Sequence, residues 1–368
     1  MEIKLGGVGL DKILLLLKKY DCNFKDRNKT CIDFLRKNYS EYIEDVKVSL
    51  APEDNQLVGI EMCKMVSELL KDIEKNSELL IDVLELYNNG RIKNASEKAF
   101  EVFNKMKPKL MYRYSSVQYN EIYYRIRKID EENIFSLERR ELFHIPNDCK
   151  HLVGTERYSM PGHPCLYLAS QPELCWYECG MPDKFAISKF EISKSENGNI
   201  KFIDFSEKLI PLAYSFLSWF HNNKKDIELI RQYLLMYIYS YPLRAACSML
   251  VKYQGAKFIE EYIIPQLLLQ WVVEDNYFYG IAYESCNSNN EAKYFGGYNI
   301  VLATKKYDSY GFDINLRENT KISEPILFDI NNIKVDPKLM KNLNVDNIKE
   351  EPTLWRLREI IPNNLEYI

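Results

Sequence analysis

The spacing of apolar residues changes near Pro108, and this change constrains the fold more than any other feature of the sequence. Before it, apolar residues recur every three or four positions, as in residues 30–46, which is the period of a helix with one buried face. After it, short apolar or alternating runs are bounded by proline and polar residues, as strands are. The sequence therefore predicts a helical N-terminal bundle followed by a domain of the α+β class.

Helices and strands do not alternate regularly after Pro108, which argues against a doubly wound parallel sheet. Three regions are expected: a helical domain (1–106), a catalytic-type domain with a mixed β core and flanking helices (107–306), and an irregular C-terminal extension packed on it (307–368). Helices are expected over 10–20, 30–46, 61–73, 77–87, 95–106, 226–241 and 257–273 (interrupted at Pro265), and strands over 110–114, 165–169, 185–192, 280–283 and 299–303.

Composition narrows the class of protein. The chain of 368 residues is 46% hydrophobic and 28% charged, so it can bury a sizeable core. A formal charge of −4 argues against a dedicated nucleic-acid-binding surface, which is normally basic. No apolar run is long enough to cross a membrane, and nine cysteines without framework spacing are typical of reduced thiols. A soluble cytoplasmic protein that binds neither nucleic acid nor membrane is expected.

Signatures of metal and phosphate sites are missing from the sequence. There is no Gly-rich phosphate loop, no nucleophile elbow and no pair of histidines at zinc spacing. One cluster combines His163, Cys165, Cys175 and Cys179, but its spacing is unlike that of zinc knuckles. Buried thiols explain these cysteines better, so no metal is expected.

Residues 143–178 concentrate side chains that could bind a nucleotide. Arg157 stands just before a Pro-Gly turn and can aim its planar guanidinium at a phosphate or carboxylate. Tyr167, on the next predicted strand, offers a flat ring and a hydroxyl, and Glu178, on the following helix, offers a carboxylate. Together these groups suit a ligand that has a phosphate, a flat cationic ring and a ribose.

These residues resemble the RES domain family, whose members include the toxins of RES–Xre toxin–antitoxin systems. Arg157, Tyr167 and Glu178 follow one another at the family's intervals of ten and eleven residues. Glu156 and Ser159 stand where family members usually have glycine and asparagine. The resemblance covers about 110–305 and includes Tyr112-Arg113-Tyr114, Arg157-Tyr158, Pro161-Gly162, Leu166-Tyr167-Leu168, Glu178, the apolar run 262–268 and Gly280-Ile281-Ala282-Tyr283-Glu284-Ser285.

The resemblance implies an ADP-ribosyltransferase-like fold and an enzyme that degrades NAD+, as a glycohydrolase or a phosphorylase. Cleavage of the nicotinamide–ribose bond passes through an oxocarbenium-like state, which the Glu178 carboxylate would stabilise. Tyr167 would stack on the nicotinamide, and Ser285 would bind the ring amide or the ribose. Arg157 and Arg113 would hold the pyrophosphate or the ribose-phosphate, and Tyr158 and His144 are further candidate binding residues. NAD+ is then the substrate, and no cofactor is expected.

Several alternatives stay open at this point. The same pocket could transfer ADP-ribose to a macromolecule, or the domain could bind a nucleotide or a protein without catalysis. Each candidate residue also has an ordinary structural explanation, such as packing for Tyr167 or an ion pair for Arg157. A separate antitoxin or regulator chain and a homodimer are candidate partners. The N-terminal helices could regulate the domain or simply complete its core.

Overall fold

A computed structural model of the chain describes residues 19–20, 30–49, 59–114, 121–129, 138–192, 201–206, 227–253, 255–286, 297–329, 361 and 364–368. The chain forms two compact units, each built from two segments: unit 1 is Met1–Tyr112 with Ile203–Trp271, and unit 2 is Arg113–Phe202 with Val272–Ile368. This division differs from the expected 1–106, 107–306 and 307–368, because the second half of the chain returns helices to the N-terminal bundle.

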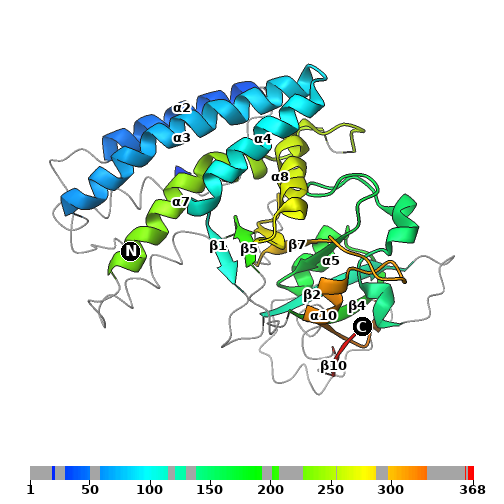
Figure 1. The fold of residues 1–368 in the computed structure, drawn as a ribbon. Coiled ribbons are helices and arrows are strands. Elements are labelled where there is room, and N and C mark those ends of the chain that lie inside the picture. The colour runs from blue at the N-terminus through cyan, green and yellow to red at the C-terminus, as the bar shows by residue number, and fades with distance from the viewer. Residues whose placement is uncertain are drawn as a thin grey trace, which may run out of the picture. The chain divides into compact units, whose positions relative to one another are not determined.

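Unit 1 is helical (Figure 1). The predicted helices at 30–46 and 95–106 are found with slightly different ends, whereas the segment 10–20 lies, apart from Lys19 and Tyr20, outside the described residues. Its elements are α2 (Cys31–Ser49), α3 (Gly59–Asn88), α4 (Ile92–Met106), η2 (Lys107–Lys109), α7 (Ile227–Cys247), η6 (Glu260–Tyr262) and the first part of α8 (Ile263–Glu274).

Helix α3 is continuous, whereas two helices, 61–73 and 77–87, were predicted. Polar residues predicted the break between them, but Asn76 and Ser77 are buried and hydrogen-bonded within unit 1. The Asn76 amide donates to the Tyr239 hydroxyl at 3.0 Å, and the Ser77 hydroxyl donates to the Ile73 carbonyl at 2.7 Å. Because these polar groups are satisfied, the helix continues through them.

Helix α7 passes through Pro242, where the sequence predicted its end. Proline has no amide hydrogen, so the carbonyl of Ile238, four residues earlier, loses its helical donor. The hydroxyl of Tyr42 on α2 donates to that carbonyl at 2.9 Å, and the Tyr42 ring stacks on Tyr241 with centroids 3.8 Å apart. Tyr42 of α2 therefore supplies the missing hydrogen bond and packs against α7 at its proline.

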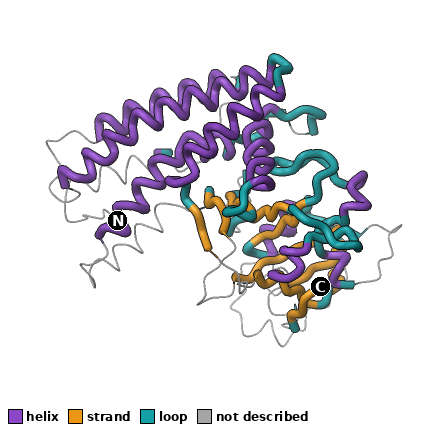
Figure 2. The backbone as a smooth tube through the Cα atoms, viewed as in Figure 1, coloured by secondary structure: helices purple, strands orange, loops and turns teal. Residues whose placement is uncertain are grey.

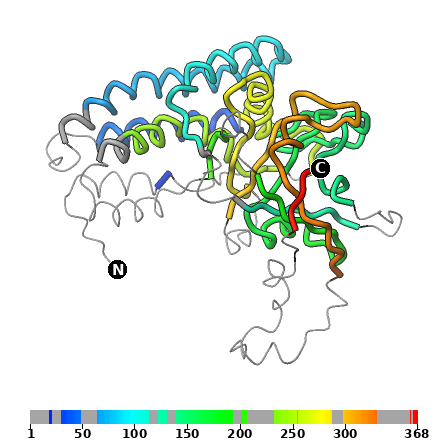
Figure 3. The backbone as a smooth tube through the Cα atoms, turned by 60° about the horizontal axis from the view of Figure 1, so that its bottom comes forward, coloured from blue at the N-terminus to red at the C-terminus, as the bar shows by residue number. Residues whose placement is uncertain are grey.

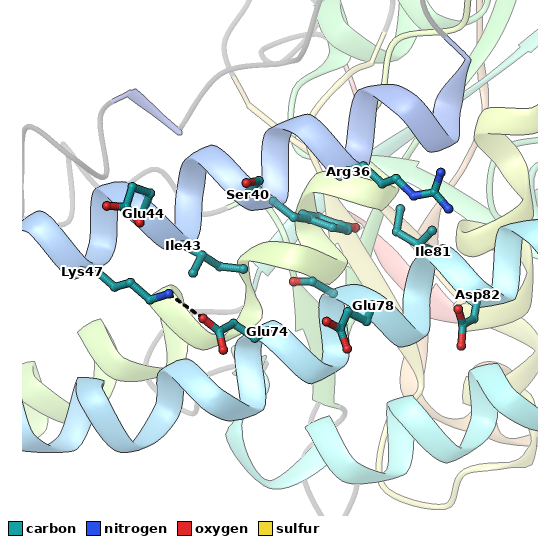
Figure 4. A pocket seen from close by; sticks show the side chains of 11 residues that line it. Arg36, Ser40, Ile43, Glu44, Lys47, Glu74, Glu78, Ile81 and Asp82 are labelled. Atoms are coloured by element: carbon teal, nitrogen blue, oxygen red, sulfur yellow. Dashed lines mark ion pairs between the residues drawn. The ribbon is translucent and has the colours of Figure 1, made fainter.

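A groove of about 580 Å³ runs between α2 and α3 (Figure 4). Its floor includes Ile43 and Ile81, and its rim is charged. Lys47 of α2 reaches across it to Glu74 of α3, with 2.7 Å between the charged atoms. Both side chains are more than a third exposed, so this ion pair contributes little to stability.

Unit 2 contains most of a mixed sheet, whose strands are orange in Figure 2. The strand order is β1-β5-β6-β7-β3-β2-β4-β8-β10, with β9 paired to β4. The α+β prediction is confirmed. All five predicted strands are present, and five more were not predicted. The strands are β1 (Tyr112–Tyr114), β2 (Glu121–Lys128), β3 (Cys165–Ala169), β4 (Lys184–Ile192), β5 (Lys201–Asp204), β6 (Gly280–Tyr283), β7 (Asn299–Ala303), β8 (Thr320–Ser323), β9 (Ile326–Asp329) and β10 (Leu365–Tyr367).

The C-terminal region is part of this sheet and not an irregular extension, because β8 and β9 both pair with β4. Strand β10, red in Figure 3, then pairs with β8. Short helices connect the strands: η3 (Arg139–Leu142), η4 (Asn147–Leu152), α5 (Pro172–Glu178) and α10 (Ile314–Asn319). One apolar cluster covers each face of the sheet, and α5 contributes Leu174 and Cys175 to one of them.

Candidate active site

The register of three adjacent strands brings Tyr167, Tyr283 and Asn299 to one face of the sheet. Tyr283 of β6 lies opposite Asn299 of β7, and Asn299 lies opposite Ala169 of β3. Directly paired residues share a face, and Tyr167 lies two residues before Ala169, so it shares that face too. Helix α5 packs on the same side through Leu174. Polar and aromatic groups from β3, β6 and β7 thus meet beside one helix.

Glu178 is the last residue of α5 and presents its carboxylate to these strands. The side-chain amide of Asn299 donates to the Glu178 carboxylate at 3.1 Å. Glu178 is exposed, so its charge remains accessible to a ligand. The strand residue fixes the direction of the carboxylate, as an orienting group does in an enzyme site.

Arg157 and Tyr158 occupy the middle of a tight turn. The Ser159 amide donates to the Glu156 carbonyl at 3.2 Å, and the Ser159 hydroxyl accepts from the Glu156 amide at 3.2 Å. Arg157 is only 7% exposed and Tyr158 is fully buried, with its ring 4.7 Å from that of Tyr283. The turn therefore places the Arg157 guanidinium near Tyr283, which Glu178 also approaches.

Charges converge around the ring of Tyr283. Burial raises the pKa of Tyr283 well above its ordinary value, the Glu178 carboxylate raises it further, and the Arg157 guanidinium opposes both. Desolvation and then the charge of Glu178 raise the pKa of Glu156. The thiol of Cys286 feels the same groups, since burial raises its pKa and Arg157 opposes the shift. We call Glu156, Arg157, Tyr158, Tyr167, Glu178, Tyr283 and Asn299 the Glu178 cluster.

Tyr167 is a member of this cluster, and Ser285 follows Tyr283 by two residues in the chain. Burial raises the pKa of Tyr167 well above its ordinary value, so at neutral pH it is an uncharged phenol with a ring suited to stacking. Tyr283 and Glu156 lie near enough to add to that shift. Ser285 is half-buried and directly precedes Cys286 on the segment that leaves β6. The structure therefore brings together four predicted site residues: Arg157, Tyr158, Tyr167 and Glu178. Ser285 is placed only by its chain neighbour Cys286, whose pKa responds to Arg157 and Glu178.

Arg125 of β2 is a candidate that sequence reasoning missed. The ladder between β2 and β3 contains the single pair Tyr124 and Ala169, so the two strands part from Arg125 and Leu168 onward. Burial lowers the pKa of Arg125, while the thiols of Cys175 and Cys179 and then Tyr167 oppose the shift. Its Nη1 atom is buried and has no hydrogen-bond partner among the described residues. A desolvated cation with an unused donor is typical of a ligand site.

His144 and Arg113 are not brought into the Glu178 cluster. The His144 ring is buried and uses both nitrogens: Nδ1 bonds the Ile145 carbonyl at 2.8 Å, and Nε2 accepts from the Asp313 amide at 2.9 Å. This geometry gives His144 a structural role at the start of α10. Arg113 lies in β1, with β5, β6 and β7 between it and the strand of Tyr167, and its side chain is outside the described residues.

The described part of the chain contains no group of three His, Cys, Asp or Glu side chains placed to hold a metal ion. Among the helices that the structure describes, none combines the length and apolar character needed to cross a membrane.

Comparison with known proteins gives one informative match. The chain is 29% identical over 337 residues to a protein of Bacillus subtilis (strain 168) described as "Putative toxin YopC", which covers 88% of this chain and 72% of that protein. No protein-family model matches the chain, and no solved structure matches it. The similarity extends over both units, so it is not a match of the sheet alone.

Proposed function

We propose that this protein is a toxin that cleaves the nicotinamide–ribose bond of NAD+. The observation that carries the proposal is the Glu178 carboxylate, held at 3.1 Å by Asn299 beside Tyr167 and Tyr283. The toxin assignment is supported by the similarity to the B. subtilis protein, and the NAD+ assignment by the resemblance to RES domains. The ADP-ribosyltransferase-like arrangement of the sheet belongs to the same proposal.

The chemistry follows from the charges of the cluster. As nicotinamide leaves, positive charge develops on C1′ and the ring oxygen of the ribose. Glu178 lies at the exposed end of the cluster and would oppose this charge while it holds the ribose 2′-hydroxyl. Water or phosphate would then attack C1′. Tyr167 would stack on the nicotinamide ring, because its phenol is uncharged and its ring is only partly covered.

The two arginines would bind the pyrophosphate. Arg157 is buried beside Tyr283, so its charge is poorly screened by water. Arg125 has an unused donor at Nη1 and lies near Tyr167, at the point where β2 and β3 part. Ser285 would contribute a hydrogen bond to the ring amide or the ribose. Arg125 replaces Arg113 in this proposal, because β1 lies at the edge of the sheet.

The test is release of free nicotinamide from NAD+ by the purified full chain. Glu178→Gln keeps the oxygen that accepts from Asn299 but removes the charge, so turnover should fall on the order of 100- to 1,000-fold. Glu318→Gln, an exposed helical glutamate of unit 2, is the matched control and should leave turnover unchanged. An undiminished rate in Glu178→Gln under saturating NAD+ would remove Glu178 from the mechanism.

The same assay separates the rival functions. Nicotinamide release without labelled protein supports hydrolysis or phosphorolysis, whereas ADP-ribose found on a macromolecule supports transfer. No release and no label would favour a binding module. Because an uncontrolled NAD+-consuming enzyme would kill its host, we also infer a separate antitoxin. Expression of the wild type alone should therefore arrest growth, and Glu178→Gln should relieve the arrest.

A further inference from the structure

Two cysteines lie one helical turn apart at the end of α5. Cys175 is buried, whereas Cys179 is exposed and directly follows Glu178. The Cys179 amide donates to the Cys175 carbonyl at 3.1 Å, so the turn that joins them is intact. Side chains four residues apart on a helix have Cβ atoms about 5–6 Å from each other. The Cys179 sulfur also lies 3.7 Å from the Ile126 carbonyl oxygen of β2.

The surroundings of the two sulfurs differ in a way that matters for reactivity. A hydrogen bond from the Cys175 thiol lowers the pKa of Cys179, and the Arg125 guanidinium lowers it further, although burial and the carboxylates of Glu178 and Glu156 oppose the shift. The same hydrogen bond raises the pKa of Cys175. Burial raises the pKa of Cys165 to about 12 and also raises that of Cys286. An exposed cysteine with a lowered pKa, one helical turn from a buried cysteine, is the arrangement expected of a peroxide-sensitive pair.

We propose that Cys179 and Cys175 form a peroxide-sensitive thiol pair, which a hydroperoxide converts to a disulfide across the last turn of α5. The Cys179 thiolate attacks the peroxide; an S–O bond forms, the O–O bond breaks, and the departing alkoxide or hydroxide takes a proton from solvent to leave as an alcohol or water. The Cys175 sulfur then attacks the Cys179 sulfur, the S–O bond breaks, and the departing hydroxide takes the Cys175 proton as water. The two electrons that the thiols lose reduce the peroxide.

The disulfide would change the end of α5. It needs Cβ atoms about 3.5–4.5 Å apart, which is closer than one intact helical turn allows. Two bonds that close this helix end would be strained, from the Met181 amide to the Trp176 carbonyl and from the Gly180 amide to the Tyr177 carbonyl, both 3.0 Å. Glu178 lies between the two cysteines and would move relative to Asn299. If the proposed function holds, oxidation therefore lowers NAD+ cleavage.

Peptide mapping tests the thiol pair without any assay of activity. The reduced full chain is treated with hydrogen peroxide, its remaining thiols are alkylated, and it is digested with chymotrypsin, which can cut after Trp176 and Tyr177. The expected product is a peptide with Cys175 joined to one with Cys179, lighter than the separate peptides by two hydrogen atoms. Alkylation of both cysteines after oxidation would overturn the proposal.

Variants identify which sulfur reacts first. In Cys175→Ser the oxidised Cys179 has no partner, so a sulfenic-acid probe such as dimedone should label Cys179. In Cys179→Ser the probe should not label Cys175. Cys149, a half-buried cysteine elsewhere in unit 2, is the internal control. Labelling of Cys179 no faster than that of Cys149 would also overturn the proposal.

An activity measurement then tests the effect on Glu178. Peroxide should lower nicotinamide release by the wild type at least 10-fold, dithiothreitol should restore it, and Cys179→Ser should be insensitive. A mapped disulfide with unchanged turnover would overturn the regulatory effect. If the reduced protein releases no nicotinamide at all, the proposed function fails, while the peptide map still decides the thiol pair.

Discussion

The guanidinium of Arg125 is held at a cost to stability. Its Nη1 atom is buried without a hydrogen-bond partner among the described residues, and burial lowers its pKa. Replacing a poorly compensated buried ion by an apolar side chain of similar length is often neutral or stabilising. Arg125→Met should therefore leave the free energy of unfolding unchanged or raise it by about 1 kcal/mol.

Although Arg125→Met should not destabilise the fold, it should weaken NAD+ binding. If Arg125 holds the pyrophosphate, Arg125→Met should raise the KM for NAD+ by at least about 10-fold, which corresponds to about 1.4 kcal/mol. Urea unfolding and nicotinamide release measure the two effects on the same preparation. Arg140→Met, at an arginine whose side chain is 59% exposed, is the control and should change neither quantity. A large loss of stability in Arg125→Met would identify a structural arginine instead.

The sequence identified some site residues and missed others for a physical reason. Arg157, Tyr167 and Glu178 stand at fixed intervals along one short segment, which local spacing can reveal. Arg125 stands within an ordinary strand pattern, and its meaning depends on the register that ends the β2–β3 ladder beside it. Asn299 likewise acquires its role only because β7 lies between β3 and β6. The spacing of residues within one segment does not predict the register between strands that are distant in the sequence.

At the scale of elements, the proline in α7 predicts that Tyr42 stabilises this helix. The Tyr42 hydroxyl donates at 2.9 Å to the Ile238 carbonyl, the acceptor that Pro242 leaves without a helical amide. Tyr42→Phe leaves this buried carbonyl unpaired and should cost about 1–3 kcal/mol of unfolding free energy. In a Pro242→Ala background the new amide can bond Ile238, so the cost should be smaller.

Denaturant unfolding of the wild type, both single variants and the double variant gives the coupling directly. Tyr39→Phe is the matched control. The Tyr39 hydroxyl donates at 2.8 Å to the Pro242 carbonyl, and in a helix that carbonyl can also accept from the amide four residues later. Its cost should depend less on residue 242. An equal cost of Tyr42→Phe in both backgrounds would contradict this account.

The start of α10 is predicted to be sensitive to acid. Burial lowers the pKa of His144 from 6.5 to about 4, and its neutral Nε2 accepts the Asp313 amide. The unfolded chain therefore binds this proton more readily than the folded one. The contribution is fully present above pH 6.5 and is lost as pH falls toward 4, by roughly 3 kcal/mol at most.

A glutamine can accept the same bond without titrating, so His144→Gln should lose less stability than the wild type between pH 7 and about 4.5. Urea unfolding at the two pH values measures this difference, and other titrating groups cancel in the comparison. His151→Gln, at an exposed histidine of the same unit, is the control and should follow the wild type. Parallel profiles for His144→Gln and the wild type would show that His144 does not titrate in this range.

Element prediction failed where tertiary contacts override local signals. Polar residues in α3 suggested a break, but burial of Asn76 against Tyr239 removes it. The short strands β8 and β9 have too few residues for a clear alternation and exist because β4 pairs with them. Long periodic segments such as α2, and strands bounded by proline such as β3, were predicted well.

At the scale of the whole molecule, two segments that are far apart in the sequence form the helical bundle of unit 1. Helix α2 buries Leu35, Tyr39, Tyr42 and Val46, and two of these tyrosines bond carbonyls of α7. Residues 1–106 were expected to form a separate domain, but Ile203–Trp271 completes the same unit. The N-terminal helices therefore cover apolar surface of a later segment, which favours completion of a core over a detachable regulatory role.

A chain that begins at Lys107 tests this conclusion. It retains α7 but lacks α2 and α3, which exposes Tyr237, Ile238 and Tyr241, all nearly inaccessible in the intact protein. Exposure of such an apolar patch promotes association, so the shortened chain should aggregate on size-exclusion chromatography. Co-expression of residues 1–106 as a separate polypeptide should restore soluble protein, because the bundle can then assemble from two pieces. A soluble, folded and more toxic shortened chain would instead identify the N-terminal helices as an inhibitor of unit 2.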